Sequence, residues 1–347
     1  MSIFGIGAKP GRRMAGIAVA LLATVLSGPT MAETVLSYSN WHPPGYVVTK
    51  VMMPWLEKVA EVTEGRVRVE VRAAPVGTPK EQADVVRDGL ADMALVVPGY
   101  TPGRYPLLEL AEMPLISVDA VAQAPAFARL FEKHMAPLKP FEGAQVLSAF
   151  NVGPFKILSR DKPVNTVADL SGLKLYVSTR GGSALMQAAG TVPVSATSAE
   201  MFSLISTGVI DGFLNPFESA ISFGVSPYLK HVTIVPNGLG QAGMVLIVNE
   251  DKWQSISPED QAAIKAIAGE ALALEIGNAL MAGEATSRAA MEAEGTIVTE
   301  LPADQIAILE ERMAPIFADW VEKSKAAGLE NAQQVLDEYR AELAIQP

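Results

Sequence analysis

Three polar side chains draw attention because each lies in or at the end of an apolar stretch. Lys156 occurs in "VGPFKILS", Tyr176 in "LKLYV" and Asn215 in "GFLNP". An ammonium group, a phenol and an amide can all donate hydrogen bonds, and together they suit the binding of one carboxylate. Arg180 in "STRGGS" is a fourth candidate, because a guanidinium at the start of a helix would lie beside its positive end. Structural roles stay open for all of them: a solvated edge charge, a packed ring or a turn cap.

Aromatic side chains are expected to surround these donors. Phe, Trp and Tyr make up only 6% of the chain, yet several of them, and one histidine, lie in loops or beside the residues named above. They are Trp41, His42, Tyr100, Phe155, Phe213 and Phe217. Such rings fit a flat apolar ligand body, because ring stacking contributes about 0.5–1.5 kcal/mol beyond area burial. The alternative is that these rings pack in hydrophobic cores.

Enzymatic chemistry finds little support in the sequence. There is no cysteine and no G-x-S-x-G motif, and no histidine has an acidic neighbour that would orient it for nucleophilic catalysis. The three histidines, His42, His134 and His231, lack the spacing of a zinc site. We therefore expect no enzyme, no metal and no cofactor. An exported hydrolase remains the alternative, since sequence alone does not exclude a carboxylate pair for glycoside chemistry.

The elements that position these residues alternate between strand and helix patterns. Residues 34–40 and 66–74 have strand patterns, and the segment between them has a helical pattern that ends at Gly65. The same alternation follows later in the chain, for example the strand pattern "GLKLYVST" before the helical "RGGSALMQAAG". This order predicts an α/β architecture with a largely parallel sheet.

One motif occurs twice and suggests two lobes of like topology. In "VVRDGLADMALVVPG" and "LISTGVIDGFLNPFE" a helix is followed by Gly-x-x-Asp, an apolar run and a proline turn. Gly89 and Gly208 are expected to cap the helices, and Asp92 and Asp211 to bind backbone before each strand. Open α/β sheets bind ligands beyond the carboxyl ends of their strands, which is where Asn215 stands.

Length and charge agree with an exported two-lobed protein. The chain has 347 residues, more than the roughly 250–300 at which one core stops growing. Residues 1–32 combine a basic start, an apolar run and small residues, which predicts a cleaved signal peptide, with an uncleaved anchor as the alternative. Its removal takes away three positive charges and no negative one, so the net charge changes from −11 to −14. Such a surface repels nucleic acid.

Several segments in this order resemble the solute-binding receptors of TRAP transporters, the DctP-type family. They are "DVVRDGLADMAL", "DLSGLKLYV", "TGVIDGFLNP" and "VNEDKWQSISPEDQAAI", and the similarity covers nearly all of the chain after residue 32. The resemblance implies an α/β, two-lobed fold like that of periplasmic binding proteins, with hinge strands and a helical C-terminal segment. It also implies a receptor that closes on an organic anion and delivers it to a membrane permease.

The residues of the family's ligand site are only partly retained. The arginine that clamps a carboxylate in the family falls on Tyr176, and a second basic residue falls on Lys156. The asparagine of the family's Asn-Pro pair is kept as Asn215, but the two polar residues before it are replaced by Phe213 and Leu214. We therefore expect an apolar or aromatic monocarboxylate as the ligand, with a C4-dicarboxylate or sugar acid as the alternative.

The expected organisation follows from these patterns. Residues 1–32 form the signal peptide; residues 33–152 form lobe I, with a return segment at about 243–282; residues 153–242 form lobe II; and helices at about 283–347 brace both lobes. The expected partners are a small organic acid anion and the subunits of a TRAP permease, with no nucleic acid. We expect a monomer in the periplasm, and a receptor that signals to a sensor kinase remains an alternative to one that delivers cargo.

Overall fold

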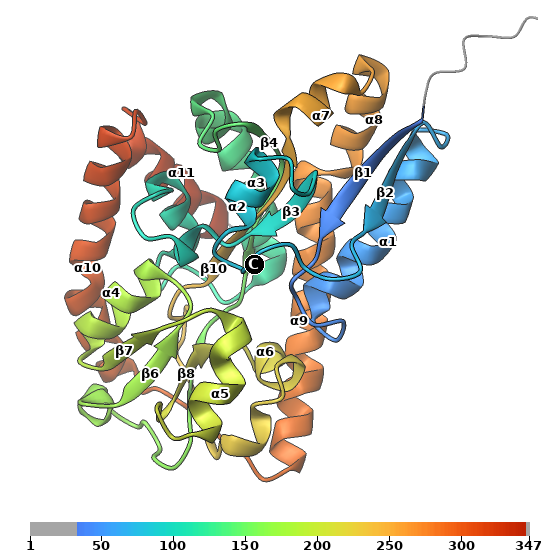
Figure 1. The fold of residues 1–347 in the computed structure, drawn as a ribbon. Coiled ribbons are helices and arrows are strands. Elements are labelled where there is room, and N and C mark those ends of the chain that lie inside the picture. The colour runs from blue at the N-terminus through green and yellow to red at the C-terminus, as the bar shows by residue number, and fades with distance from the viewer. Residues whose placement is uncertain (1–32, 345–347) are drawn as a thin grey trace, which may run out of the picture. The chain divides into compact units, whose positions relative to one another are not determined.

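The computed structural model describes residues 33–344 (Figure 1). The expected signal peptide, residues 1–32, lies outside the described residues, as do residues 345–347. At Arg180 the backbone is described and the side chain is not. No helix in the described part of the chain combines the length and apolar composition needed to span a bilayer.

The first lobe contains a five-stranded sheet. Its strands are β1 (Thr34–Ser39), β2 (Val67–Val71), β3 (Met93–Val96), β4 (Ala144–Val152) and β10 (Ala242–Asn249), in the order β2-β1-β3-β10-β4. β1 is parallel to β2 and β3, whereas β10 is antiparallel to β3 and β4. The expectation of a largely parallel sheet therefore fails at β10, because this strand returns from the second lobe and runs opposite to β4, which leaves the first lobe.

The second lobe contains a six-stranded sheet with a mixed order. Its strands are β5 (Lys156–Ser159), β6 (Lys174–Val177), β7 (Val192–Ser195), β8 (Gly212–Asn215), β9 (His231–Ile234) and β11 (Ile297–Glu300). They lie in the order β11-β9-β5-β8-β6-β7, and only β5 is antiparallel to its neighbours. The edge strand β11 comes from the C-terminal segment for which only helices were expected.

Helices cover both sheets. In the first lobe they are α1 (Val47–Val62), α2 (Gln82–Arg87), α3 (Ala120–Leu130), α7 (Glu250–Ser255) and α8 (Pro258–Ile267). In the second lobe they are α4 (Arg180–Ala189), α5 (Met201–Ser206) and α6 (Phe217–Ser222). Strand β3 is buried on both sides, because Met93 and Leu95 enter one hydrophobic core and Ala94 and Val96 enter another.

The repeated Gly-x-x-Asp motif has the structural role expected for it. Gly89 and Gly208 adopt φ angles of 68° and 74°, which are left-handed values that glycine tolerates best. The Asp92 carboxylate accepts a hydrogen bond of 2.7 Å from the Ser37 backbone N–H, and Asp211 accepts one of 2.8 Å from Lys174. Each aspartate thus joins the start of its strand to a neighbouring strand.

Two strand connections and two long helices link the lobes. The chain passes from β4 to β5 through residues 153–155 and returns from β9 to β10 through residues 235–241. A hydrogen bond joins the two connections, because the Phe155 N–H donates to the Gly240 carbonyl at 3.0 Å. Helix α9 (Gly269–Ala293) packs against α1 and α3 of the first lobe and α6 of the second. Helix α10 (Ala303–Ala326) contacts α4 in the second lobe and α11 (Ala332–Ala344) in the first. The two-lobed fold with hinge strands and a helical C-terminal segment is thus confirmed.

Candidate functional site

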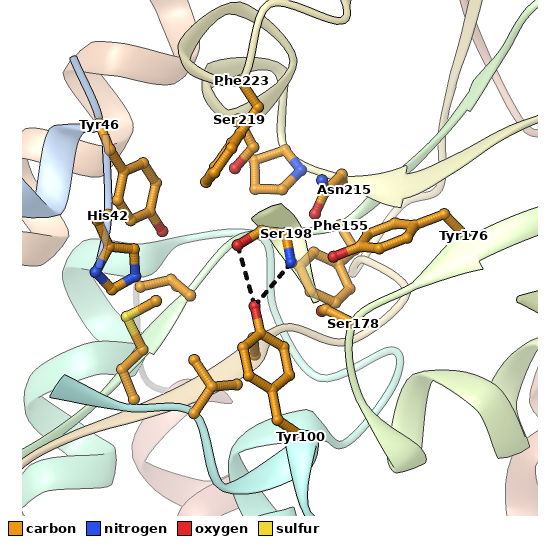
Figure 2. Close-up of a pocket in the computed structure, with 15 residues that line it drawn as sticks. His42, Tyr46, Tyr100, Phe155, Tyr176, Ser178, Ser198, Asn215, Ser219 and Phe223 are labelled. Carbon is orange, nitrogen blue, oxygen red and sulfur yellow. Dashed lines mark hydrogen bonds between the residues drawn. The ribbon is translucent and has the colours of Figure 1, made fainter. Parts of the chain in front are cut away.

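A pocket lies at the junction of the two lobes (Figure 2). Its volume is about 30 Å³. Both lobes and the returning strand β10 contribute side chains to it. The lining residues are His42, Tyr46, Val97, Tyr100, Val152, Phe155, Tyr176, Ser178, Ser198, Asn215, Pro216, Ser219, Phe223, Ala242 and Met244.

The loop between β1 and α1 holds His42 firmly in place. The Trp41 indole N–H donates to the Leu95 carbonyl at 3.0 Å, and the Trp41 ring stacks on the His42 ring with centroids 3.5 Å apart. The ring of Tyr46 lies on His42 as well, at 5.1 Å. Both His42 ring nitrogens are buried without a hydrogen-bond partner, and burial lowers the pKa of the imidazole to about 3. His42 is therefore neutral in this conformation.

The second lobe presents Tyr176 and Asn215 from the opposite side of the pocket (Figure 2). Tyr176 is fully buried on β6, its ring packs edge-on against Phe213 at 5.5 Å, and its hydroxyl has no hydrogen-bond partner. Burial first, and then the nearby Tyr100 and Glu200, raises the pKa of Tyr176 well above its usual value, so the hydroxyl keeps its proton. The Asn215 amide makes one weak contact, of 3.4 Å to the Met201 sulfur. Both groups can donate to a ligand.

Hydrogen bonds join the lobes around the pocket. The Tyr100 hydroxyl lies 3.1 Å from the Ser198 hydroxyl and accepts a bond of 3.2 Å from the Ser198 N–H. The Gly181 N–H, in the first turn of α4, donates to the Glu112 carboxylate at 2.9 Å. Burial is the main cause that raises the pKa of Glu112 to about 8. The described conformation is therefore one in which the lobes are in contact.

Replacing Gly181 with alanine is expected to favour separation of the lobes. A Cβ atom at this position would lie 2.3 Å from a Glu112 carboxylate oxygen, closer than van der Waals contact allows. Overpacking of this kind costs about 1–3 kcal/mol, which corresponds to a shift of about 5- to 150-fold in the equilibrium. Small-angle scattering without ligand should give a larger radius of gyration for Gly181→Ala. The control is Gly45→Ala, where a Cβ meets no atom within 4 Å; equal radii in both variants would contradict the expectation.

Five of the ten side chains selected from the sequence line this pocket. They are His42, Tyr100, Phe155, Tyr176 and Asn215. The other aromatic candidates lie behind it. Trp41 supports the His42 ring, whereas Phe213 and Phe217 are buried in a core of the second lobe. For Arg180 the structure describes only the backbone, at the start of α4.

Lys156 is placed differently from the expectation. Its ammonium group forms an ion pair with the Glu284 carboxylate of α9, and also donates to the Pro154 carbonyl at 3.1 Å. It lies over the Phe217 ring, 5.1 Å from the centroid, and is not part of the pocket lining. A buried ammonium group requires a counter-charge, and here the protein supplies it. The Lys156 ammonium therefore has a structural partner, contrary to the expectation that it faces the ligand.

Several lining residues were not anticipated from the sequence. Ser219 and Phe223 lie in or just after α6, the short helix that begins directly after the Asn-Pro pair, so a search over the two turns beyond that pair would have found them. Tyr46 immediately precedes α1 and faces His42 across the loop. No local pattern marks Met244, which joins the site only because β10 returns to the first sheet.

The pocket offers uncharged donors and apolar walls. Among the side chains that the structure describes, no lysine or arginine lines it, and the polar groups are hydroxyls, one amide and one imidazole. Within the same described residues no cluster of metal-binding side chains occurs. The arrangement can hold one small polar or anionic group while an apolar body packs against rings such as Phe155 and Phe223.

The chain is similar to known solute-binding proteins along most of its length. The model of the family described as "Bacterial extracellular solute-binding protein, family 7" matches residues 38–324. The chain is 29% identical over 334 residues to "Outer membrane transporter protein TsaT" of Comamonas testosteroni, covering 96% of this chain and 98% of that protein. A TRAP periplasmic solute-binding protein from Bordetella bronchiseptica with bound (R)- and (S)-mandelate is 30% identical, with a TM-score of 0.86 and coverage of 89% and 98%. A TRAP solute-binding protein from Rhodoferax ferrireducens with copurified benzoate is 28% identical, with a TM-score of 0.82 and coverage of 89% and 97%.

Proposed function

Because this chain belongs to the bacterial extracellular solute-binding proteins of family 7, the DctP-type receptors of TRAP transporters, we propose that it captures an aromatic monocarboxylate in the interlobe pocket. The observation that carries this proposal is the pocket lining: aromatic and apolar walls, with a few uncharged donors and no lysine or arginine among the described side chains. The receptor would work as a monomer in the periplasm and pass its ligand to a TRAP permease.

The lining favours one carboxylate on a flat apolar body. The Tyr176 hydroxyl and the Asn215 amide can donate to a carboxylate from the second lobe, and His42 can do so from the first. The rings of Phe155 and Phe223 supply apolar contact. Two solved relatives, at 30% and 28% identity, hold mandelate and benzoate, which have this combination of groups.

Ligand entry requires the lobes to separate. In the described conformation, with the lobes in contact, the pocket volume of about 30 Å³ is too small for an aromatic acid. The connections 153–155 and 235–241 and the helices that span both lobes provide the places where a hinge can act. The ligand would bind to the separated lobes and be enclosed when they close.

Thermal denaturation with and without ligand tests this function. Benzoate or mandelate at 100 times its dissociation constant is expected to stabilise the protein by about 2.7 kcal/mol, because it binds only the folded state. Asn215→Ala should bind at least about tenfold more weakly, since a hydrogen bond to a charged group contributes about 1.5–3 kcal/mol. Asn278→Ala, on an exposed part of α9, is the matched control. Absence of stabilisation by any aromatic acid would contradict the proposal.

A further inference from the structure

We propose that the pocket binds its carboxylate together with one proton, which His42 takes up so that its imidazolium becomes the counter-ion of the ligand. This inference rests on the proposed function, because it concerns how the same pocket holds an acid. The proton passes from solvent to a ring nitrogen of His42, while the ligand keeps its negative charge. The loaded pocket then has the same net charge as the empty one.

The placement of His42 carries the inference. Its side chain lines the pocket, is only 5% exposed, and has two ring nitrogens without any hydrogen-bond partner. Unpartnered buried polar atoms are rare in folded proteins, and here they lie in a cavity where a ligand can satisfy them. The ring cannot turn away easily, because Trp41 and Tyr46 pack against it. A protonated His42 would donate through a nitrogen to the enclosed carboxylate.

No other described group is positioned to neutralise the ligand. The pocket tyrosines, Tyr46, Tyr100 and Tyr176, have pKa values raised chiefly by burial, so they remain uncharged donors. The buried ammonium group of Lys156 is already paired with Glu284.

The carboxylates near the pocket make an uncompensated anion still less favourable. Glu218 accepts a hydrogen bond of 3.1 Å from the Val47 N–H at the start of α1, and its second oxygen is buried and unpartnered. Burial raises the pKa of Glu218. Glu200 and Glu284 also act on the pocket tyrosines and raise their pKa values. An anion enclosed in this field without a proton would have hydrogen-bond donors but no counter-charge, and buried charges without a counter-charge are costly.

Histidine is the group whose titration suits this role. Its ordinary pKa of about 6.5 lies above the value of about 4 for a carboxylic acid, so near neutral pH a proton binds more readily to imidazole than to the ligand. In the described conformation burial lowers the pKa of His42 to about 3, which keeps the ring neutral when no anion lies beside it. An adjacent carboxylate stabilises the protonated ring and raises its pKa. Proton uptake therefore accompanies loading of the closed pocket.

Calorimetric titration with benzoate in buffers of different ionisation enthalpy measures this uptake. We expect proton uptake on benzoate binding that grows as the pH is lowered from 7.5, and an affinity that falls by up to about tenfold for each unit of rising pH. Contact between the lobes also buries Glu112, and burial raises the pKa of this carboxyl group. Closure of the lobes would therefore make Glu112 bind a proton in addition to the one on His42. The titration is therefore made in Glu112→Gln, which keeps an oxygen that can accept from Gly181, as well as in the unaltered chain.

Variants at the three histidines assign the proton. His42→Gln should abolish the uptake, reduce affinity for benzoate at least about tenfold at pH 7 and make it independent of pH. His134→Gln and His231→Gln are matched controls, because His134 contacts Glu338, His231 lies on β9, and neither lines the pocket. The chain contains only three histidines, so an untagged sample allows NMR to observe the His42 ring directly. Its signals should change from neutral to imidazolium on saturation with benzoate at pH 7.

The outcomes separate this inference from the proposed function. Benzoate binding without proton uptake, with a neutral His42 ring in the NMR spectrum, would overturn the inference alone; loss of that binding in Arg180→Gln would then identify a fixed cation. Uptake that persists in His42→Gln would overturn the assignment and place the proton on the ligand or Glu218. If benzoate, mandelate and 3-hydroxybenzoate do not bind at any pH from 5 to 8, the proposed function fails, and this inference fails with it.

Discussion

Replacing Lys156 with alanine is expected to lower the free energy of unfolding by about 3–5 kcal/mol, as removal of one partner from a buried ion pair does. The lysine is 8% exposed and its Glu284 partner 6% exposed, so the glutamate would be left as a buried charge with no counter-charge. The pair joins β5 to α9, and the other Glu284 oxygen joins α9 to α6 because it accepts from the Glu218 N–H at 2.8 Å. Urea denaturation of the unliganded protein measures the loss.

Two further variants show whether burial is the cause. Lys230→Ala removes an exposed lysine that pairs with Asp161 at 2.7 Å, and should cost less than about 1 kcal/mol. A double variant, Lys156→Met with Glu284→Leu, should recover most of the stability, since apolar replacements of buried pairs are often neutral or stabilising. If Lys156→Ala retains full stability but cannot bind benzoate, then the lysine contacts the ligand, and the prediction that its ion pair with Glu284 stabilises the fold is wrong.

Aromatic monocarboxylates are expected to bind at least about 100-fold more tightly than succinate or glucuronate. Each polar group that is enclosed without a partner costs about 1–3 kcal/mol, and these two ligands bring a second carboxylate or several hydroxyls into a pocket with few free donors. The family resemblance predicts that Tyr176 replaces a carboxylate-clamping arginine and that Phe213 and Leu214, both buried, replace two polar residues. Calorimetry with all ligands at equal ionic strength measures the order.

The matched comparison for this selectivity is benzoate against phthalate, which adds only a second carboxylate to the same ring. Phthalate should bind at least about 100-fold more weakly than benzoate, for the same reason. If succinate or glucuronate binds most tightly, a cation has entered the pocket, and Arg180 is the candidate to replace. Arg180→Gln would then weaken binding of the dicarboxylate far more than binding of benzoate.

The sequence predicted those parts of the fold that depend on local patterns. The repeated Gly-x-x-Asp motif located two similar sheet edges, and the alternation of strands and helices indicated two α/β lobes. Asn215 could be proposed as a pocket residue because it lies at the end of a strand that a motif identified, and Tyr176 because it is a polar group in an apolar strand at the position of the family's arginine. The antiparallel β10 and the edge strand β11 could not be located in this way, because sheet order depends on contacts between distant segments.

The role of Lys156 shows why the site was harder to predict than the fold. A lysine in an apolar strand requires a counter-charge, and the sequence does not reveal whether a ligand or the protein supplies it. Glu284, the actual partner, lies 128 residues away in a helix that spans both lobes. His42 presents the opposite case. Its importance comes from the absence of any partner for its ring nitrogens, which only the folded arrangement can show.

The hydrogen bonds that join the lobes also affect how strongly the receptor can respond to its ligand. If the ligand enters only between separated lobes, as we propose, then only the fraction of molecules with separated lobes is able to bind. If one empty molecule in ten is open, the apparent dissociation constant is about tenfold higher than that of the open form. The bond between Gly181 and Glu112 therefore helps to set the ligand concentration at which the receptor fills. Variation at this contact can tune sensitivity without altering any group that touches the ligand.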